Sequence, residues 1–202
     1  MSLYPLMVEG SALFAVVVGG GSVATRKVKA LLDAGAKVRV VATEAGSDLL
    51  DLASRLRIEL VLEAYSRDYL SDASLVVAAT NDAAVNTRIA EDARGLGRLV
   101  NVVTAPSDGN CITPAVYRSG EVVVAVSAGG VPDAAARIRD AIGQRLDQRY
   151  ADAVQSLSAL RRELIDGGER DRWTSAAAAL IGDDFCDRVD SGRFAEAMRE
   201  WR

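Results

Sequence analysis

The chain has 202 residues, half of them apolar and only 5% aromatic. This suits either one medium domain or a domain of about 110–150 residues with a smaller appendage, with a core of Ala, Val and Leu. The net charge of −4 argues against general nucleic-acid binding, which needs many Lys and Arg contacts to phosphates. No apolar stretch reaches the roughly 18 residues of a membrane span. The chain holds no histidine, so the commonest metal ligand and general base is missing.

Localisation is predicted from the cysteines and from the first ten residues. Cys111 and Cys186 are far apart and form no CxxC motif, which fits a reducing compartment. The first ten residues lack the basic start of a signal peptide. We therefore expect a cytoplasmic protein that does not act at a membrane.

Short apolar runs alternate with helical stripes up to residue 103. Continuous, β-branched runs are typical of buried parallel strands. We expect strands at residues 12–18, 37–42, 58–62, 74–79 and 99–103. Helices are expected between them, at residues 23–34, 46–57 and 83–96. This alternation predicts an α/β fold, a Rossmann-type doubly wound parallel sheet with helices on both faces.

The pattern changes after residue 103. A turn-rich stretch at 104–110 precedes a predicted β-hairpin, with strands at 112–117 and 121–127 around a loop at 118–120. Helices are expected at residues 131–146, 151–165, 170–181, 183–189 and 192–201. We divide the chain into a doubly wound domain at 1–110, a hairpin-plus-helix region at 111–146 and a helical region at 147–202.

The stretch VVVGGGSVATRKV, residues 16–28, joins the first strand to the first helix. Gly19 would allow the tight turn, Gly21 would let the main chain approach a pyrophosphate, and small Ala24 would let helix and strand pack closely. The helix N-terminus attracts the anion. The context predicts a dinucleotide site at residues 1–110; the alternative is a strand–helix turn with no ligand.

The end of the second strand is where an acidic residue usually holds the adenosine ribose. Here either Glu44 serves, or Thr43 and the main chain do; the alternative for Glu44 is a solvated carboxylate at a helix start. No arginine follows this strand in the sequence to take a 2′-phosphate, so NAD is predicted over NADP.

The fourth strand ends in VVAATND, residues 76–82. Ligands bind outside the carboxyl ends of the strands in this architecture. Thr80 and Asn81 are therefore predicted to contact the nicotinamide half of the cofactor. Asp82 either joins them or caps the next helix, and the two roles are compatible.

The motifs GGGSVATRK, LVVAATND, NVVTAP, VVVAVSAGG and GGERDRW follow one another in this order. Together they resemble the precorrin-2 dehydrogenase/sirohydrochlorin ferrochelatase family, the N-terminal module of siroheme synthase. The resemblance covers nearly the whole chain. It implies NAD-dependent oxidation of the tetrapyrrole precorrin-2 to sirohydrochlorin, followed in some members by insertion of ferrous iron. It also implies a homodimer formed through the hairpin and helix at 111–146.

Several site residues follow from this resemblance. Those implied for the cofactor, beside Gly19, Thr80 and Asn81, are Gly21, Ser22, Val23, Thr43, Glu44 and Val102. Those implied for the substrate are Asn101, Ser127, Gly129, Gly130 and Arg137. Arg137 is the first choice among the arginines because it lies shortly after the Gly129-Gly130 turn and because guanidinium pairs well with carboxylate.

One departure from the family concerns its catalytic acid. The family has an Asp after NVV, where this chain has Thr104. Threonine has no useful basicity near neutral pH, although it is able to hydrogen-bond a substrate or a water. Asp108 either swings into this role or is a plain turn residue. We expect dehydrogenation to be retained and ferrochelation to be weak or absent.

Two other functions stay open. One is a Rossmann oxidoreductase for a different substrate, although no Lys-Tyr pair with the usual helical spacing is found. The other is a paralogue or sensor that binds NAD or a tetrapyrrole and has lost chemistry along with the acid. The regions beyond residue 110 argue mildly against a sensor, which needs only the first domain.

Overall fold

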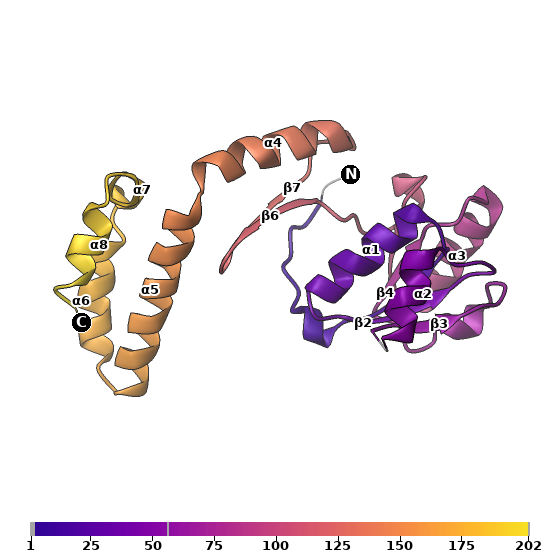
Figure 1. Cartoon of the computed structure of the whole chain (residues 1–202), viewed down its shortest axis with the longest axis horizontal. Helices are drawn as coiled ribbons and strands as arrows, with labels where there is room; N and C mark the ends of the chain where they lie inside the picture. Colours follow the sequence, from indigo (N-terminus) through magenta and orange to yellow (C-terminus); the bar gives the residue numbers. More distant parts are fainter. Residues whose placement is uncertain (1–2, 56, 202) are drawn as a thin grey trace. The chain divides into compact units, whose positions relative to one another are not determined.

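The computed structural model describes residues 3–55 and 57–201, which form two compact units that divide between Thr113 and Pro114 (Figure 1). In the first unit, five parallel strands form one sheet in the order β3-β2-β1-β4-β5. The strands are β1 (Phe14–Val18), β2 (Lys37–Val41), β3 (Glu59–Val61), β4 (Leu75–Ala78) and β5 (Leu99–Val102). The predicted Rossmann-type fold is confirmed.

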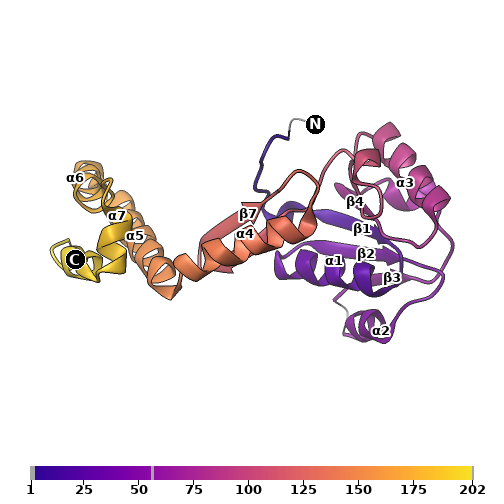
Figure 2. The same ribbon diagram turned by 90° about the horizontal axis from the view of Figure 1, so that it is seen from above.

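Helices cover both faces of this sheet. They are α1 (Ser22–Asp33), α2 (Ser47–Ser54) and α3 (Ala83–Gly95), with short 3-10 turns at Gly10–Ala12, Arg67–Leu70 and Pro106–Asp108. Figure 2 shows α1 and α2 on one side of the sheet and α3 on the other.

Successive residues of β1 enter two separate cores. Val16 packs into the cluster that contains Ile89 of α3, whereas Val17 packs into the cluster that contains Val28 of α1 and Leu49 of α2. Because both faces are buried, apolar residues are favoured at every position of the strand, which explains the continuous run in the sequence. The strand order reverses between β1 and β4, and a crevice forms at such a point outside the carboxyl ends of the strands.

Over the described residues 114–201, the second unit contains an antiparallel hairpin and five helices. Its elements are β6 (Ala115–Ser119), β7 (Val122–Val126), α4 (Pro132–Arg145), α5 (Gln148–Asp166), α6 (Arg170–Leu180), α7 (Phe185–Asp190) and α8 (Arg193–Met198). The boundary expected near residue 146 stays a prediction. Within this unit the hairpin also contacts α5, since Ser158 donates a 2.6 Å hydrogen bond to Glu121 of the turn.

The hairpin turn differs from the sequence prediction. A loop over 118–120 was expected, yet Ser119 pairs with Val122, which leaves a two-residue turn. Gly120 has a φ of +54°, a conformation that glycine adopts without steric cost. The strand predicted from residue 112 begins only at Ala115, because Pro114 has no main-chain donor for a ladder.

The other boundaries shift by at most three residues. The first strand was predicted from residue 12 but starts at Phe14, because Gly10–Ala12 forms a 3-10 turn that the Leu13 amide closes on the Gly10 carbonyl at 2.9 Å. The helix predicted at 46–57 ends at Ser54, and residue 56 lies outside the described residues.

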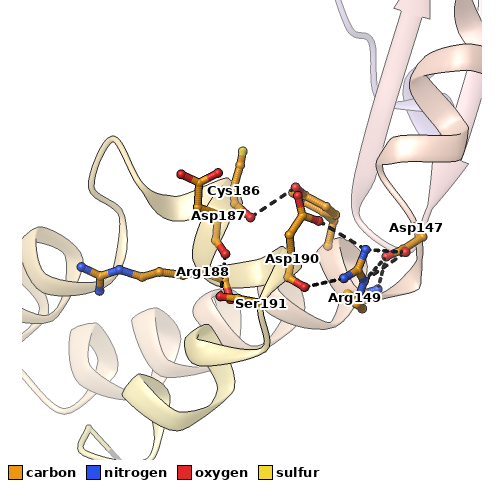
Figure 3. Close-up of polar contacts among 8 residues, drawn as sticks. Asp147, Arg149, Cys186, Asp187, Arg188, Asp190 and Ser191 are labelled. Atoms are coloured by element: carbon orange, nitrogen blue, oxygen red, sulfur yellow. Dashed lines mark hydrogen bonds and ion pairs between the residues drawn. The ribbon is translucent and has the colours of Figure 1, made fainter.

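Arg149 connects α5 with α7 in the second unit, as Figure 3 shows. Its guanidinium donates to the Asp190 carbonyl at 2.7 Å and lies 2.9 Å from the Asp147 carboxylate. Hydrogen bonds from Arg149 lower the pKa of Asp147. Beside them Tyr150 is buried, and burial, followed by the Asp190 charge, raises its pKa to about 12.

No helix in the described part of the chain is long and apolar enough to cross a membrane.

The packing of α4 predicts that an alanine at Gly143 destabilises the protein, although alanine usually stabilises a helix. A Cβ on Gly143 would lie 2.7 Å from the Tyr117 ring, and the Tyr117 hydroxyl is held by the Leu146 carbonyl at 2.6 Å. Gly143→Ala should therefore lower the free energy of unfolding by about 1–3 kcal/mol through overpacking. This would outweigh the helix propensity of alanine, which favours the substitution by about 1 kcal/mol.

Urea unfolding followed by circular dichroism measures this change. In a Tyr117→Ala background the ring is gone, so the same Gly143→Ala substitution should become stabilising. A stabilising effect in the native background, or the same loss in both backgrounds, would contradict the packing.

Candidate functional site

A hollow of about 780 Å³ lies at the carboxyl ends of β1, β2 and β4, at the predicted edge of the sheet. Six of the residues predicted to bind the cofactor line it: Gly19, Gly21, Thr43, Glu44, Thr80 and Asn81. These residues come from three loops that are distant in sequence, and the parallel sheet brings them together. The volume lies in the range of ordinary ligand pockets, roughly 300–1,000 Å³.

Three consecutive glycines form the loop after β1, and each has a different environment. Gly19 has a φ of +128°, and a Cβ there would lie 2.4 Å from the Ala79 carbonyl oxygen. A Cβ on Gly20 would lie 1.7 Å from the carbonyl oxygen of Glu44. A Cβ on Gly21 would meet nothing within 4 Å. Gly19 and Gly20 are thus required by the fold, whereas Gly21 borders open space.

Gly20 was not among the predicted site residues. The G-x-G pattern leaves the middle position free, so the pattern carries no signal for it. The requirement comes from the loop after β2, whose Gly46 amide donates to the Gly20 carbonyl at 3.1 Å. This bond and the close Glu44 carbonyl hold the two loops of the hollow together.

The start of α1 offers free main-chain donors. Gly21 is the N-cap residue without a side-chain cap, and the Thr25 amide makes the first helical bond, to the Gly21 carbonyl at 3.0 Å. The amides of Ser22 and Val23 precede this bond and so have no partner within the helix. Such a helix start is suited to a phosphate or another anion. Ser22 also lines a second hollow of about 560 Å³, with Arg26 and Lys29.

The larger hollow is also lined by residues that the sequence prediction missed. Glu63, Tyr65 and Arg88 line it together with Thr43 and Glu44. The Tyr65 hydroxyl donates to Asp92 at 3.0 Å, and the Arg88 guanidinium lies 5.9 Å from the centre of the Tyr65 ring.

Burial, followed by the hydrogen bond to Asp92, raises the pKa of Tyr65, so the phenol stays a neutral donor. Glu63 and Tyr65 come soon after β3 in the chain. The rule that ligands bind at the carboxyl ends of strands could therefore have indicated them from the sequence.

The loop after β4 is held by its own side chains. The Asp82 carboxylate accepts the amides of Ala84 at 2.8 Å and Val85 at 3.2 Å, so Asp82 caps α3 and also borders the hollow. The helix-cap role weighed for Asp82 is thus observed, and its contact with the cofactor stays a prediction. Asn86 of α3 is only 2% exposed and hydrogen-bonds both Thr80 and Thr104. No sequence motif had indicated Asn86.

At the end of β5, the predicted residues lie in different environments. Asn101 is 5% exposed, and its amide donates to the Cys111 carbonyl at 3.3 Å. The side chain of Val102 is fully buried in the core. Thr104 is exposed and lies 3.3 Å from the amide nitrogen of Asn86. The substrate role of Asn101 and the cofactor role of Val102 stay predictions.

Asp108 lies in the 3-10 turn Pro106–Asp108. Its carboxylate accepts the Ser107 hydroxyl at 3.3 Å, and its carbonyl accepts a 3.0 Å bond from Arg94. Within residues 3–55 and 57–201, no hydrogen bond links Asp108 to Thr104. The contacts suit a turn residue, and a catalytic role for Asp108 stays a prediction.

Four predicted substrate residues belong to the second unit. Ser127 directly follows β7, and Gly129 and Gly130 have positive φ angles of +56° and +84°. Arg137 is exposed on α4. Their roles stay predictions. Across the described ranges of the chain, no three His, Cys, Asp or Glu side chains gather as metal ligands.

Comparison with known proteins gives several matches. A family model described as "Putative NAD(P)-binding" matches residues 6–115. Siroheme synthase of Saccharophagus degradans is 30% identical over 98% of this chain and 43% of that protein. Siroheme synthase of Nitrosospira multiformis is 38% identical over 98% and 41% respectively. The chain thus spans about two-fifths of the length of these curated relatives.

A solved structure, SirC, precorrin-2 dehydrogenase, superposes with a TM-score of 0.75 at 25% sequence identity. The superposition covers 98% of this chain and 100% of SirC. The resemblance predicted from the sequence motifs is confirmed by these matches. Since the matching family model covers more than half of the residues and includes the glycine turn and the hollow beside it, the chain belongs to the putative NAD(P)-binding family.

Proposed function

We propose that the chain is an NAD-dependent precorrin-2 dehydrogenase, which oxidises precorrin-2 to sirohydrochlorin. The observation that carries this proposal is the likeness to SirC, which extends over 98% of the chain and so includes the second unit as well as the nucleotide hollow. A protein that only sensed a nucleotide would need the first unit alone. The siroheme synthases that match 98% of the chain support the same pathway.

The hollow suits a dinucleotide. The free amides of Ser22 and Val23, beside the open space at Gly21, would hold the pyrophosphate. Thr43 and Glu44 would hold the adenosine ribose, and Thr80 with Asn81 would border the nicotinamide half. When bound, NAD supplies the acceptor for the hydride that leaves the substrate.

Two carboxylates favour NAD over NADP. Glu44 and Glu63 both line the hollow and would repel a 2′-phosphate. Arg88 is a positively charged residue that lines the same hollow. Its Nε lies 3.8 Å from the Asp92 carboxylate, and its guanidinium lies over the Tyr65 ring.

The tetrapyrrole carries several carboxylates, which need donors. The exposed Arg137 and the open Gly129-Gly130 turn would supply them. Residues 111–146 would form the interface of a homodimer. The two cysteines are unpaired, which suits the cytoplasm.

Thr104 limits which reactions the chain performs. Hydride transfer depends mainly on holding substrate and cofactor together, and a threonine can contribute to that. Metal insertion also requires pyrrole protons to leave. Thr104 is not basic enough to accept them, and the sequence contains no histidine that could do so. We therefore propose that ferrochelation is weak or absent.

The glycine turn generates a matched pair of variants. Gly21→Ala should leave stability almost unchanged, since Gly21 has a φ of −84° and open space, but should weaken NAD binding by about tenfold, because the methyl group enters the space of the pyrophosphate. Gly20→Ala should lower the melting temperature, because its methyl group meets the Glu44 carbonyl. Calorimetric titration and thermal unfolding separate the two effects. Unchanged NAD affinity in Gly21→Ala would contradict the assigned binding mode.

Glu44 generates a specificity prediction. Glu44→Gln removes the repulsion and should reduce the preference for NAD over NADP by about tenfold, the scale of one charged hydrogen bond. Glu63→Gln is the matched control and should change the preference less, because Glu63 already accepts the Tyr69 hydroxyl. The ratio of kcat/KM for the two cofactors is the measurement. A larger effect from Glu63→Gln would move the ribose contact to that residue.

Thr104 generates the main test of the proposed function. Anaerobic absorbance should show NADH and sirohydrochlorin formed from precorrin-2 by the native protein. Thr104→Asp should increase kcat, because a positioned base contributes about 10²–10⁴-fold. Its activity should fall at low pH, as the new carboxylate takes up a proton near its ordinary pKa of about 4.

Thr104→Asn, of similar size and without charge, is the control and should show no gain. Native protein that is inactive while Thr104→Asp is active would identify a binding paralogue that has lost its acid. If both the native protein and Thr104→Asp are inactive, the enzyme acts on a substrate other than precorrin-2.

A further inference from the structure

Asn86 occupies a buried position where α3 meets the ends of β4 and β5. Its Oδ1 accepts the Thr80 amide at 3.2 Å and the Thr80 hydroxyl at 2.7 Å. Its Nδ2 donates to the Thr80 carbonyl at 3.0 Å and to the Thr104 hydroxyl oxygen at 3.3 Å. With 2% of its surface exposed, every polar atom of this side chain is used inside the protein.

The main chain of Thr80 determines which way the Asn86 amide points. A main-chain N–H only donates and a carbonyl only accepts, so Oδ1 must face the Thr80 amide and Nδ2 the Thr80 carbonyl. The reverse orientation would place two donors together and two acceptors together. The atom that reaches Thr104 is therefore a donor, and the Thr104 oxygen accepts.

This direction determines what Thr104 has left to offer. A hydroxyl group carries one hydrogen, and the hydrogen of Thr104 is not used in the bond with Asn86. In the described part of the chain, the Thr104 hydroxyl donates to no protein acceptor. Thr104 is exposed, and it follows β5 at the edge where β4 ends, since Ala78 pairs with Val102 in the sheet. Its hydrogen therefore remains available beside the loop that borders the nucleotide hollow.

We infer that Asn86 is a positioning residue that holds Thr104 as a hydrogen-bond donor to the tetrapyrrole. This inference rests on the proposed function, which supplies the substrate. Thr104 contacts the substrate through its hydrogen rather than removing a proton from it. Asn86 also holds the main chain of Thr80, which lines the nucleotide hollow. One buried amide thus supports both the cofactor side and the substrate side.

The inference predicts how the two residues depend on each other. Thr104→Val removes the hydroxyl at constant size and should lower kcat about three- to tenfold, the value of one hydrogen bond, with unchanged NAD affinity. Asn86→Asp keeps acceptors for the Thr80 amide and hydroxyl. Its new carboxylate, however, would accept the Thr104 hydrogen and turn that hydroxyl inward. It should therefore lower kcat at least as much as Thr104→Val.

The double variant tests the coupling. If Asn86 acts on turnover through Thr104, Asn86→Asp should lower kcat less in the Thr104→Val background than in the native protein. Asn86→Asp should also weaken NAD binding, because repulsion from the Thr80 carbonyl loosens that turn. Calorimetric titration with NAD and single-turnover absorbance with precorrin-2 give the two readouts.

Asn110 is the matched structural control. Its Oδ1 accepts the Val100 amide at 2.7 Å and its Nδ2 donates to the Arg98 carbonyl at 2.9 Å, which braces the opposite, amino end of β5. Asn110→Ala should lower the melting temperature and leave kcat and NAD affinity unchanged. If Asn86→Asp does not fold, Asn86→Ser takes its place; it removes the donor to Thr104, so it should also lower kcat less in the Thr104→Val background than in the native protein.

The outcomes separate this inference from the proposed function. Native protein that turns over precorrin-2, with kcat unchanged in Thr104→Val or with additive effects in the double variant, would overturn the inference alone. Native protein without turnover would overturn the proposed function. Sirohydrochlorin titration then decides the inference, which requires weaker binding in Thr104→Val. Native protein that neither turns over precorrin-2 nor binds sirohydrochlorin would overturn both.

Discussion

The nucleotide hollow depends on the close approach of two main-chain segments, at Gly20 and at the loop after β2. A side chain on Gly20 would overlap the Glu44 carbonyl, and the Gly46 amide is bonded to the Gly20 carbonyl. These contacts fix the loop that carries Thr43 and Glu44 against the start of α1. The glycine turn before α1 and the polar groups after β2 therefore line one hollow, although Gly21 and Thr43 lie 22 residues apart in the chain.

The parallel sheet was predictable because burial on both faces leaves a strong pattern. Val16 and Val17 enter opposite cores, so the apolar run of β1 does not alternate. The glycine turn was predictable because Gly19 must adopt a φ that other residues avoid. Gly20, Arg88 and Asn86 were missed because their importance arises from neighbours that only the folded chain supplies, whereas the position of Tyr65 after β3 could have indicated it.

The second unit shows where sequence patterns lose information. Each of its helices was predicted within three residues, and the apolar stripe of α5 shows such a local mark, since Ala153, Leu157 and Leu160 are all buried. Contacts between the hairpin and the helices, such as that of Ser158 with Glu121, leave no such local mark, because they join residues far apart in the sequence. The tight packing of Gly143 on Tyr117 is likewise invisible to a pattern, which reads a helical glycine only as a weak position.

The Asn86 amide would suit residue 104 either as this chain's threonine or as the aspartate that the family resemblance implies. An amide donor aimed at residue 104 would serve a carboxylate as well as a hydroxyl, because both oxygens accept. The surroundings of residue 104 therefore suit either residue, and the exchange alters the chemistry rather than the framework. A carboxylate there would accept a proton, whereas a threonine hydroxyl has no useful basicity near neutral pH and offers its hydrogen for a hydrogen bond. The exchange should thus cost most in steps that remove protons and least in steps that depend on orientation.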